Sequence, residues 1–295
     1  MKYEAIESLR GQHSVRKMAT VLNIRESAYY QWLKRRELAQ AKRHAQAQLA
    51  AIVLEVFEAS RRTYGYRKMV AALCEVGLVL SEYKVRQIIR AGGMYPISCS
   101  KYRPARSAKA TGRYLDNLYN QDFSTDRLNQ KWAGDITYIK TSIGWVYLAA
   151  VIDLHNREIV GYEISKKADT ELVCRALSYA LTRRDITHED GLVFHCDRGI
   201  QYASMRFQHM LEANGVTGSM SRAGCPFDNA PSESFFSAAK RECIYRKEYK
   251  DISEVRVDLF DYIEVFYNGK RIQAGLGYIS PRTHRLQIEQ LEEVA

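Results

Sequence analysis

The sequence predicts an all-helical N-terminal part followed by an α/β domain built on a mixed five-stranded sheet. Residues 131–164 contain three strand-like runs joined by short turns, and residues 170–220 alternate helix, strand, helix and strand. Meandering strands followed by alternating helices and strands are typical of a mixed sheet with helices on both faces. Residues 14–91 instead carry apolar side chains at helical spacing, interrupted by Asn, Ser and Gly.

The first predicted strand, residues 131–139, contains an acid in apolar surroundings. Side chains alternate along a strand, so Asp135, Thr137 and Ile139 share one face. A carboxylate in such a strand is costly unless something positive meets it. Two interpretations follow: a hydrogen bond or a buried Arg satisfies Asp135, or Asp135 is a metal ligand with partners elsewhere in the chain.

Two further acids qualify as such partners. Asp197 ends a second short apolar strand, and Glu233 lies about one turn inside a helix that Asp228 or Asn229 would cap. Together with Asp135 they form an all-oxygen donor set, which suits Mg²⁺ or Mn²⁺ and does not suit zinc.

Three sequence blocks carry a resemblance to a known family: Trp132-x-x-Asp135-Ile-Thr-Tyr, His195-x-Asp197-Arg-Gly-x-Gln-Tyr202 and Asp228-Asn-Ala-x-x-Glu233-Ser-Phe-Phe. With 35 residues between Asp197 and Glu233, they resemble the D,D(35)E motif of insertion-sequence transposases. More narrowly, the chain resembles, over essentially its whole length, the OrfB-type enzymes of the IS-three family in the retroviral-integrase superfamily. Cys196 and Ile200 depart from the family pattern, where Ser and a small residue are usual.

The resemblance implies a ribonuclease H-like catalytic domain and a DNA transposase that binds insertion-sequence ends and catalyses DNA cleavage and strand transfer. It implies Asp135, Asp197 and Glu233 as the catalytic residues and metal ligands, with two Mg²⁺ or Mn²⁺ ions per active site. The implied partners are double-stranded DNA, as terminal repeats and as target, and further copies of the chain on paired ends. A structure-specific nuclease on the same fold and a non-catalytic DNA-binding repressor remain as alternatives.

Charge is distributed unevenly along the 295 residues. The formal net charge is +10, but residues 1–110 hold 21 Lys and Arg against 8 Asp and Glu, and the remainder holds 23 against 26. The basic third is therefore predicted to bind nucleic acid. The six cysteines include no CxxC pair, which is typical of free thiols in a reducing compartment. No apolar run is long enough to span a bilayer. We therefore expect a cytoplasmic, nucleoid-associated protein without a membrane partner.

Residues 1–37 are predicted to form a helix-turn-helix. Ser14 would cap a short helix ending at Leu22, and a second helix would cover residues 26–36. A plain helical hairpin is the alternative interpretation, because it has nearly the same pattern. On the second helix, the side chains expected to face outward and reach a major groove are Arg25, Ser27, Gln31 and Lys34.

Residues 38–95 are predicted to form a second helical domain of helix-turn-helix type. It would contain a long helix over 38–60, a helix over 64–73 that ends by Gly77, and a helix over 82–91 capped by Ser81. The basic side chains predicted to contact DNA phosphates here are Arg67, Lys68, Arg86 and Arg90. A basic linker over residues 96–125 adds Lys101 and Arg103 to these predicted contacts.

Residues 126–295 are predicted to form the catalytic domain with a C-terminal helical extension. Asp153, in the turn after the second strand, is a rival carboxylate for which turn chemistry is the better interpretation. His195 is interpreted as a satisfied strand-end histidine. Lys240 and Arg241 lie seven and eight residues after Glu233, on the same helical face, and are predicted to hold DNA phosphates near the metals.

Overall fold

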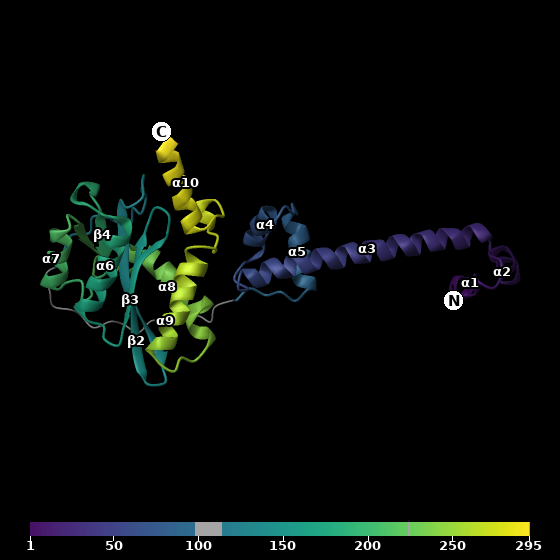
Figure 1. Cartoon of the computed structure of the whole chain (residues 1–295), viewed down its shortest axis with the longest axis horizontal. Coiled ribbons are helices and arrows are strands. Elements are labelled where there is room, and N and C mark those ends of the chain that lie inside the picture. Colours follow the sequence, from purple (N-terminus) through teal and green to yellow (C-terminus); the bar gives the residue numbers. More distant parts are fainter. Residues whose placement is uncertain (98–113, 224, 295) are drawn as a thin grey trace.

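The computed structural model describes residues 1–97, 114–223 and 225–294. The N-terminal helices stand at the far end of the long helix α3, and α4 and α5 pack beside its other end, next to the α/β domain (Figure 1). The N-terminal elements are α1 (Lys2–Leu9), α2 (Val15–Val21), α3 (Glu26–Ala59), α4 (Tyr66–Glu75) and α5 (Glu82–Ala91).

Helix α3 is longer than the sequence analysis predicts. The helices expected over residues 26–36 and 38–60 are one continuous helix of 34 residues. The segment contains neither Pro nor Gly and is rich in Ala, Leu, Gln, Glu and Arg, so nothing in it ends a helix near residue 37. The predicted domain boundary at residue 37 therefore lies inside a helix.

Helix α1 has no counterpart among the predicted elements, whereas α5 lies where predicted. In α1, Ile6 is fully buried and the ring of Tyr3 stacks on Trp32 at 5.6 Å, so tertiary contacts stabilise this short helix. In α5 the local signals are sufficient: Ser81 Oγ accepts a hydrogen bond from the Lys84 N–H at 3.3 Å, and Gly92 occupies the C-cap.

The sheet has five strands, as predicted, and their order is β3-β2-β1-β4-β5. The three N-terminal strands form an antiparallel meander, and β4 and β5 join β1 in parallel. The strands are β1 (Lys131–Thr141), β2 (Gly144–Asp153), β3 (Ile159–Ser165), β4 (Val193–Cys196) and β5 (Thr217–Met220).

Helices cover both faces of this sheet, which confirms the predicted mixed α/β architecture. Figure 1 shows α6 (Thr170–Arg184) and α7 (Met205–Ala213) on one side and α8 (Ala230–Glu242) and α9 (Ile252–Phe260) on the other. The alternation of strand side chains supplies a separate apolar core for each face, one around Leu177 and Phe194 and the other around Leu148 and Phe235.

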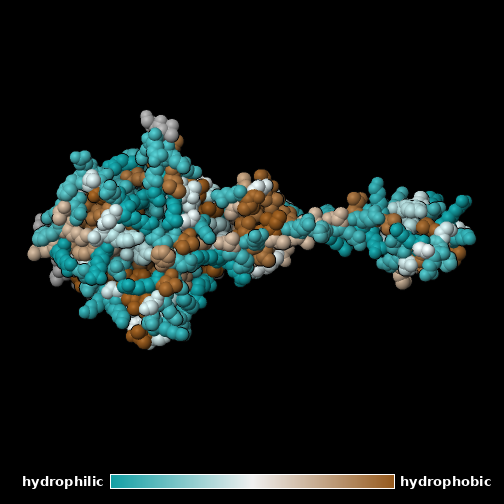
Figure 2. Space-filling view, in the orientation of Figure 1, coloured by the Kyte–Doolittle hydropathy of each residue, from teal (hydrophilic) through white to brown (hydrophobic). Residues whose placement is uncertain are grey.

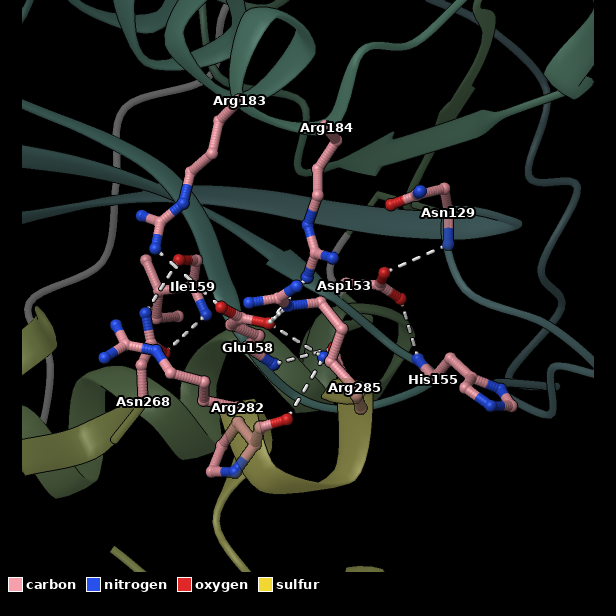
Figure 3. Close-up of polar contacts among 12 residues, drawn as sticks. Asn129, Asp153, His155, Glu158, Ile159, Arg183, Arg184, Asn268, Arg282 and Arg285 are labelled. Atoms are coloured by element: carbon pink, nitrogen blue, oxygen red, sulfur yellow. Dashed lines mark hydrogen bonds and ion pairs between the residues drawn. The ribbon is translucent and has the colours of Figure 1, made fainter. Parts of the chain in front are cut away.

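The C-terminal extension is joined to the sheet by a buried ionic network (Figure 3). Glu158, 1% exposed, accepts hydrogen bonds from Arg184 Nη2 at 2.7 Å and Arg285 Nε at 3.1 Å. Asn268 bonds the backbone of Ile159 through both its amide oxygen and its nitrogen. These contacts connect α6 and the start of β3 to α10 (Pro281–Val294) and to the π-helical segment Asp261–Tyr267 that continues α9.

Short 3₁₀ helices cover His188–Asp190, Pro226–Asn229, Ile244–Arg246 and Ala274–Leu276.

The domain formed by α4, α5 and the end of α3 docks on the same C-terminal segment. The Tyr64 hydroxyl donates to the Lys270 carbonyl at 3.0 Å and accepts the Ile272 N–H at 2.9 Å. Ile272 also joins the apolar core of this small domain, beside Val53 and Leu73. The two parts therefore share a packed interface rather than only a connecting segment.

The exposed length of α3 between the two ends of the molecule is mostly hydrophilic (Figure 2). Every side chain from residue 37 to residue 48 is exposed. Among the described residues, no helix combines the length and apolar composition needed to cross a membrane.

Candidate active site

The pairing of β1 with β4 brings the first two predicted carboxylates together. The strands run parallel, with Lys131 opposite Val193 and Ala133 opposite His195. The paired register ends there, and two residues further on Asp135 and Asp197, the residue that follows β4, are close enough for the charge of Asp197 to raise the pKa of Asp135. Two acids that are distant in sequence thus come together where β4 ends beside the middle of β1.

Gly134 makes room for the Phe194 ring beside Asp135. A Cβ at residue 134 would lie 2.3 Å from this ring, so a side chain there would displace it. The glycine next to Asp135 therefore lets the Phe194 ring, from β4, pack against β1.

Helix α8 carries the third acid to the same edge. Asn229 occupies the N-cap position, as one of the two predicted candidates, but makes no side-chain capping bond. Its Nδ2 instead donates to the Gly134 carbonyl at 3.4 Å, one residue before Asp135. Phe235 and Phe236 are buried against β1 and β2, which leaves Glu233 exposed in the first turn of the helix.

The other cap candidate, Asp228, has a different structural role. Its carboxylate is fully buried and accepts hydrogen bonds from Arg222, through the backbone N–H, Nε and Nη2, at 2.9 to 3.0 Å. The side-chain amides of Asn117 and Gln121 donate to it as well. These donors hold the pKa of Asp228 well below its usual range. Asp228 therefore connects the start of α8 to the end of β5 and to residues 117–121, a role that local sequence reasoning missed.

Asp135 feels the charges of the other two acids. Burial, the neighbouring Asp197 and, more weakly, Glu233 raise the pKa of Asp135 to about 8, against the lowering effects of the Ile136 N–H and of Lys240. Burial also raises the pKa of Asp197 and that of Glu233. Acids gathered where burial and like charge oppose ionisation form a site that favours a cationic ligand.

The residues of the site fit a hard divalent cation. One oxygen of Asp135 accepts the Ile136 N–H at 2.7 Å and one oxygen of Asp197 accepts the Gly199 N–H at 2.9 Å, so each carboxylate keeps a second oxygen. Nearby, Asn229 Oδ1 and Ser232 Oγ are buried without a hydrogen-bond partner among the described residues. Over 1–97, 114–223 and 225–294, however, no three His, Cys, Asp or Glu side chains already converge on one metal position.

The two rival residues are satisfied elsewhere. Asp153 accepts the N–H groups of Asn129 and His155 at 3.0 and 2.9 Å, as expected of a turn carboxylate. His195 is fully buried and makes hydrogen bonds to Ser219 Oγ at 2.8 Å and Ser221 Oγ at 3.0 Å. Burial lowers the pKa of His195 to about 4, so the imidazole is neutral, in agreement with its interpretation as a structural histidine.

Lys240 lies close to the carboxylates, as its helical spacing from Glu233 predicts. Its charge lowers the pKa of Asp135, and its Nζ lies 5.3 Å from the centre of the Tyr138 ring. The side chain is half-buried rather than fully in solvent, and so is that of Arg241. The contact of Lys240 with Tyr138 is not evident from sequence, because the two residues belong to different elements.

The other predicted DNA-binding residues lie far from the carboxylates in the chain's helical part. Arg25, Ser27, Gln31 and Lys34 are all exposed on the N-terminal part of α3, at the far end of the molecule (Figure 1). Arg67, Arg86 and Arg90 are exposed on α4 and α5. The predicted contacts Lys101 and Arg103 lie outside the described residues.

Lys68 differs from its neighbours on α4. It is half-buried, its Nζ lies 5.5 Å from the centre of the Tyr64 ring, and burial together with Arg271 lowers its pKa to about 8. The side chain thus faces the C-terminal segment on which this small domain docks, a position that the charge pattern of α4 does not reveal.

The arginine-rich cavity beside Glu158 is separate from the carboxylate site. It has a volume of about 420 Å³ and is lined by Arg183, Arg184 and Arg285 together with Glu158 and Glu289, among others. Its arginines pair with acids of the same region, including Glu264 and Glu289 at 2.7 and 2.8 Å. We therefore assign it to the network that holds the C-terminal extension (Figure 3).

Comparisons with known proteins agree with this architecture. Models described as integrase core domain match residues 125–226 and 233–288, and a model described as HTH-like domain matches residues 43–103. The transposase InsF of insertion sequence IS3A from Escherichia coli strain K12 is 36% identical over 95% of this chain and 97% of its own length. An uncharacterized 31 kDa protein of insertion element IS600 from Shigella sonnei is 31% identical over 93% and 99%. Among solved structures, the catalytic core of BIV integrase has a TM-score of 0.40 at 13% identity, covering 56% of this chain and 99% of that one.

The fold and these matches define a DNA transposase of the DDE class, an enzyme with an integrase core preceded by a helix-turn-helix-like domain. Within that class, the chain belongs to the transposase family of insertion sequence IS3. The resemblance given by the three sequence blocks is thereby confirmed, and neither alternative, nuclease or repressor, is favoured.

Proposed function

We propose that this transposase binds the ends of its insertion sequence and carries out DNA cleavage and strand transfer at Asp135, Asp197 and Glu233. The observation that supports the proposal is that the charges of Asp197 and Glu233 both act on Asp135, next to the pairing of β1 with β4. Phosphoryl transfer requires such a concentration of oxygen ligands next to the bond that breaks.

Two Mg²⁺ or Mn²⁺ ions, when bound, would stabilise charge on the attacking and leaving oxygens of the phosphodiester. The second oxygens of Asp135 and Asp197 and the carboxylate of Glu233 would hold them. In the first step water or a 3′-OH of the element attacks the phosphorus at the element end, a new P–O bond forms, and the P–O3′ bond breaks to leave a free 3′-OH on the element. In the second step the freed 3′-OH attacks a target phosphodiester, forming one bond while another breaks.

The helical part would hold the DNA on which these steps act. We propose a helix-turn-helix over residues 1–37 and a second such domain over 38–95, which share the continuous helix α3, then a basic linker over 96–125 and the catalytic domain over 126–295. The exposed cations of α3, α4 and α5 would contact terminal repeats, and copies of the chain would pair two ends. The far position of the N-terminal helices suits contact with DNA well outside the cleavage site (Figure 1).

Metal affinity is expected to rise with pH. The pKa of Asp135 is raised to about 8, so below pH 8 a cation must displace a proton from this carboxyl. Mg²⁺ or Mn²⁺ should therefore bind on the order of 100-fold more tightly at pH 8 than at pH 6, and little more tightly above that. Isothermal titration in two buffers of different ionisation enthalpy measures both the affinity and the released proton. Equal affinity at pH 6 and pH 8 would contradict the site.

Lys240→Ala is expected to slow cleavage while leaving the fold nearly unchanged. A charged hydrogen bond to the DNA strand is worth about 1–3 kcal/mol, which corresponds to a loss of roughly 5- to 150-fold in rate. The lost contact with Tyr138 costs stability only about 0.5–1 kcal/mol. Cleavage rates and melting temperatures of Lys240→Ala and Lys240→Arg provide the measurement. Restoration by Arg is expected, and a parallel fall of rate and stability in both variants would mean that Lys240 is only structural.

A strand-transfer assay tests the proposed function itself. Labelled element ends are incubated with the full chain, a divalent cation and a supercoiled target plasmid. Covalent joining of an end to the plasmid is the expected product. Cleavage without any joining would support a nuclease, and binding without either reaction would support a repressor.

A further inference from the structure

An exposed aromatic pair lies at the far end of the β1–β2 hairpin. The rings of Tyr138 and Trp145 meet edge to face, with centres 5.2 Å apart and an interplanar angle of 83°. They are diagonal neighbours on one face of the hairpin, since Tyr138 lies opposite Tyr147 and Trp145 lies opposite Lys140, two positions further along β1. Even so, Trp145 is 50% exposed, which is far more than cross-strand packing requires of so large a side chain.

This pair lies close to the carboxylates. Tyr138 follows Asp135 by three residues on β1, about 10 Å along the strand, or roughly three base steps of DNA. Because this odd separation puts the two side chains on opposite faces of the sheet, DNA that meets both must pass around the edge of β1. On the side away from β2, β4 pairs only with residues 131–133 of β1. Apart from β2, no strand of the described chain pairs with β1 between residues 134 and 140, so no strand pairing closes this edge between Asp135 and Tyr138.

The surroundings of the pair are positively charged. Lys240, from α8, approaches the Tyr138 ring and also acts on Asp135, so one cation connects the rings to the carboxylates. Lys140 is exposed directly opposite Trp145. Figure 2 also shows hydrophobic side chains at the lower end of the catalytic domain, where β2 and α9 are labelled in Figure 1. Aromatic faces with flanking cations are the combination with which proteins hold single-stranded nucleic acid.

We infer that Tyr138 and Trp145 form a stacking platform for an unpaired base of the DNA strand held at the carboxylates. The inference rests on the proposed function and deepens it. In a duplex both faces of a base are covered by its neighbours, so only a base that has left the stack reaches an aromatic side chain. The platform would therefore recognise a locally opened end, and Lys240 would neutralise the phosphate beside that base.

Photo-crosslinking tests where the platform meets DNA. Duplexes carrying the terminal repeat of the element that encodes this chain receive a single 5-iododeoxyuridine at successive positions around the cleaved phosphate. The full chain is irradiated with each duplex in Ca²⁺, and the crosslinked peptides are identified by mass spectrometry. Crosslinks from one to three nucleotides beside the cleaved phosphate are expected at Tyr138 or Trp145. Crosslinks from these positions that map only to other residues would overturn the inference.

Cleavage by matched variants supplies the second readout. Tyr138→Ala and Trp145→Ala should each cleave paired ends on the order of tenfold more slowly, because each removes a stacking surface. Tyr138→Phe and Trp145→Phe keep a ring and should stay near wild type, as should Ile143→Ser at the exposed hairpin tip. A mismatch at the crosslinking position should restore part of the rate of the Ala variants, which a folding defect would not allow.

Three outcomes would count against the platform. Ala variants that cleave paired ends at the wild-type rate would overturn it, and so would a defect that mismatches do not relieve. A change of sedimentation in Trp145→Ala without any platform crosslink would show that the pair is a protein interface. Failure of the proposed function is distinguishable, because the wild-type chain itself would then neither cleave nor join its element ends.

Discussion

Asp135→Asn, Asp197→Asn and Glu233→Gln are each expected to abolish cleavage and strand transfer while binding of element ends survives. Each substitution removes one negative charge at nearly constant shape, so the cation loses a ligand and the fold loses little. Cation catalysis supplies several kcal/mol of transition-state stabilisation, and the expected loss is about a thousandfold or more. Gel-based cleavage and joining assays give the rates, and electrophoretic mobility shifts give the binding.

Asp153→Asn provides the matched control for these three variants. Asp153 is also a buried carboxylate of the sheet, but it accepts its two hydrogen bonds from the backbone N–H groups of Asn129, before β1, and His155, in the turn after β2. The variant should melt at a lower temperature and still cleave DNA once folded. Activity above a few per cent of wild type in one of the three site variants would remove that residue from the catalytic set, and inactivity of folded Asp153→Asn would add the rival carboxylate to it.

Binding of element ends is expected to weaken about a thousandfold between 50 and 200 mM salt. With roughly six phosphate contacts, the logarithm of the binding constant falls against the logarithm of salt concentration with a slope near −5. The basic N-terminal third supplies these contacts, and the exposed Arg67 and Arg90 are among those expected to make them. The inactive Asp135→Asn chain allows the slope to be measured by fluorescence anisotropy without turnover.

Substitution of single basic residues then shows which side chains contribute to the salt-dependence slope. Arg67→Gln and Arg90→Gln should each reduce the slope by about 1. Arg175→Gln, on the catalytic domain, should leave it unchanged, because Arg175 pairs with Glu171 on α6 at 2.8 Å. A flat salt response of the unsubstituted chain would mean that the basic charge of residues 1–110 does not bind phosphates.

Much of the local structure is determined by short stretches of sequence. Ser81 caps α5 through a bond to Lys84, three residues away, and the alternation along residues 131–139 already places Asp135 and Ile139 on one face. The identity of the three acids likewise follows from their flanking residues and from the 35-residue spacing. These signals are readable because cap, period and turn each depend on residues only a few positions apart.

The tertiary structure decides which residues surround the three acids. Asp135 and Asp197 become neighbours through the pairing of β1 with β4, which no local pattern specifies and in which Gly134 makes room for the Phe194 ring. The clamp of Asp228 on Arg222 and Asn117, like the contact of Lys240 with Tyr138, joins separate elements of the fold. Helix α3 continues through residue 37, where the sequence analysis predicts a domain boundary, because the residues there all favour a helix. The spacing of the sequence therefore determines which residues carry the chemistry, whereas strand register and helix packing determine the charge and burial that each of them experiences.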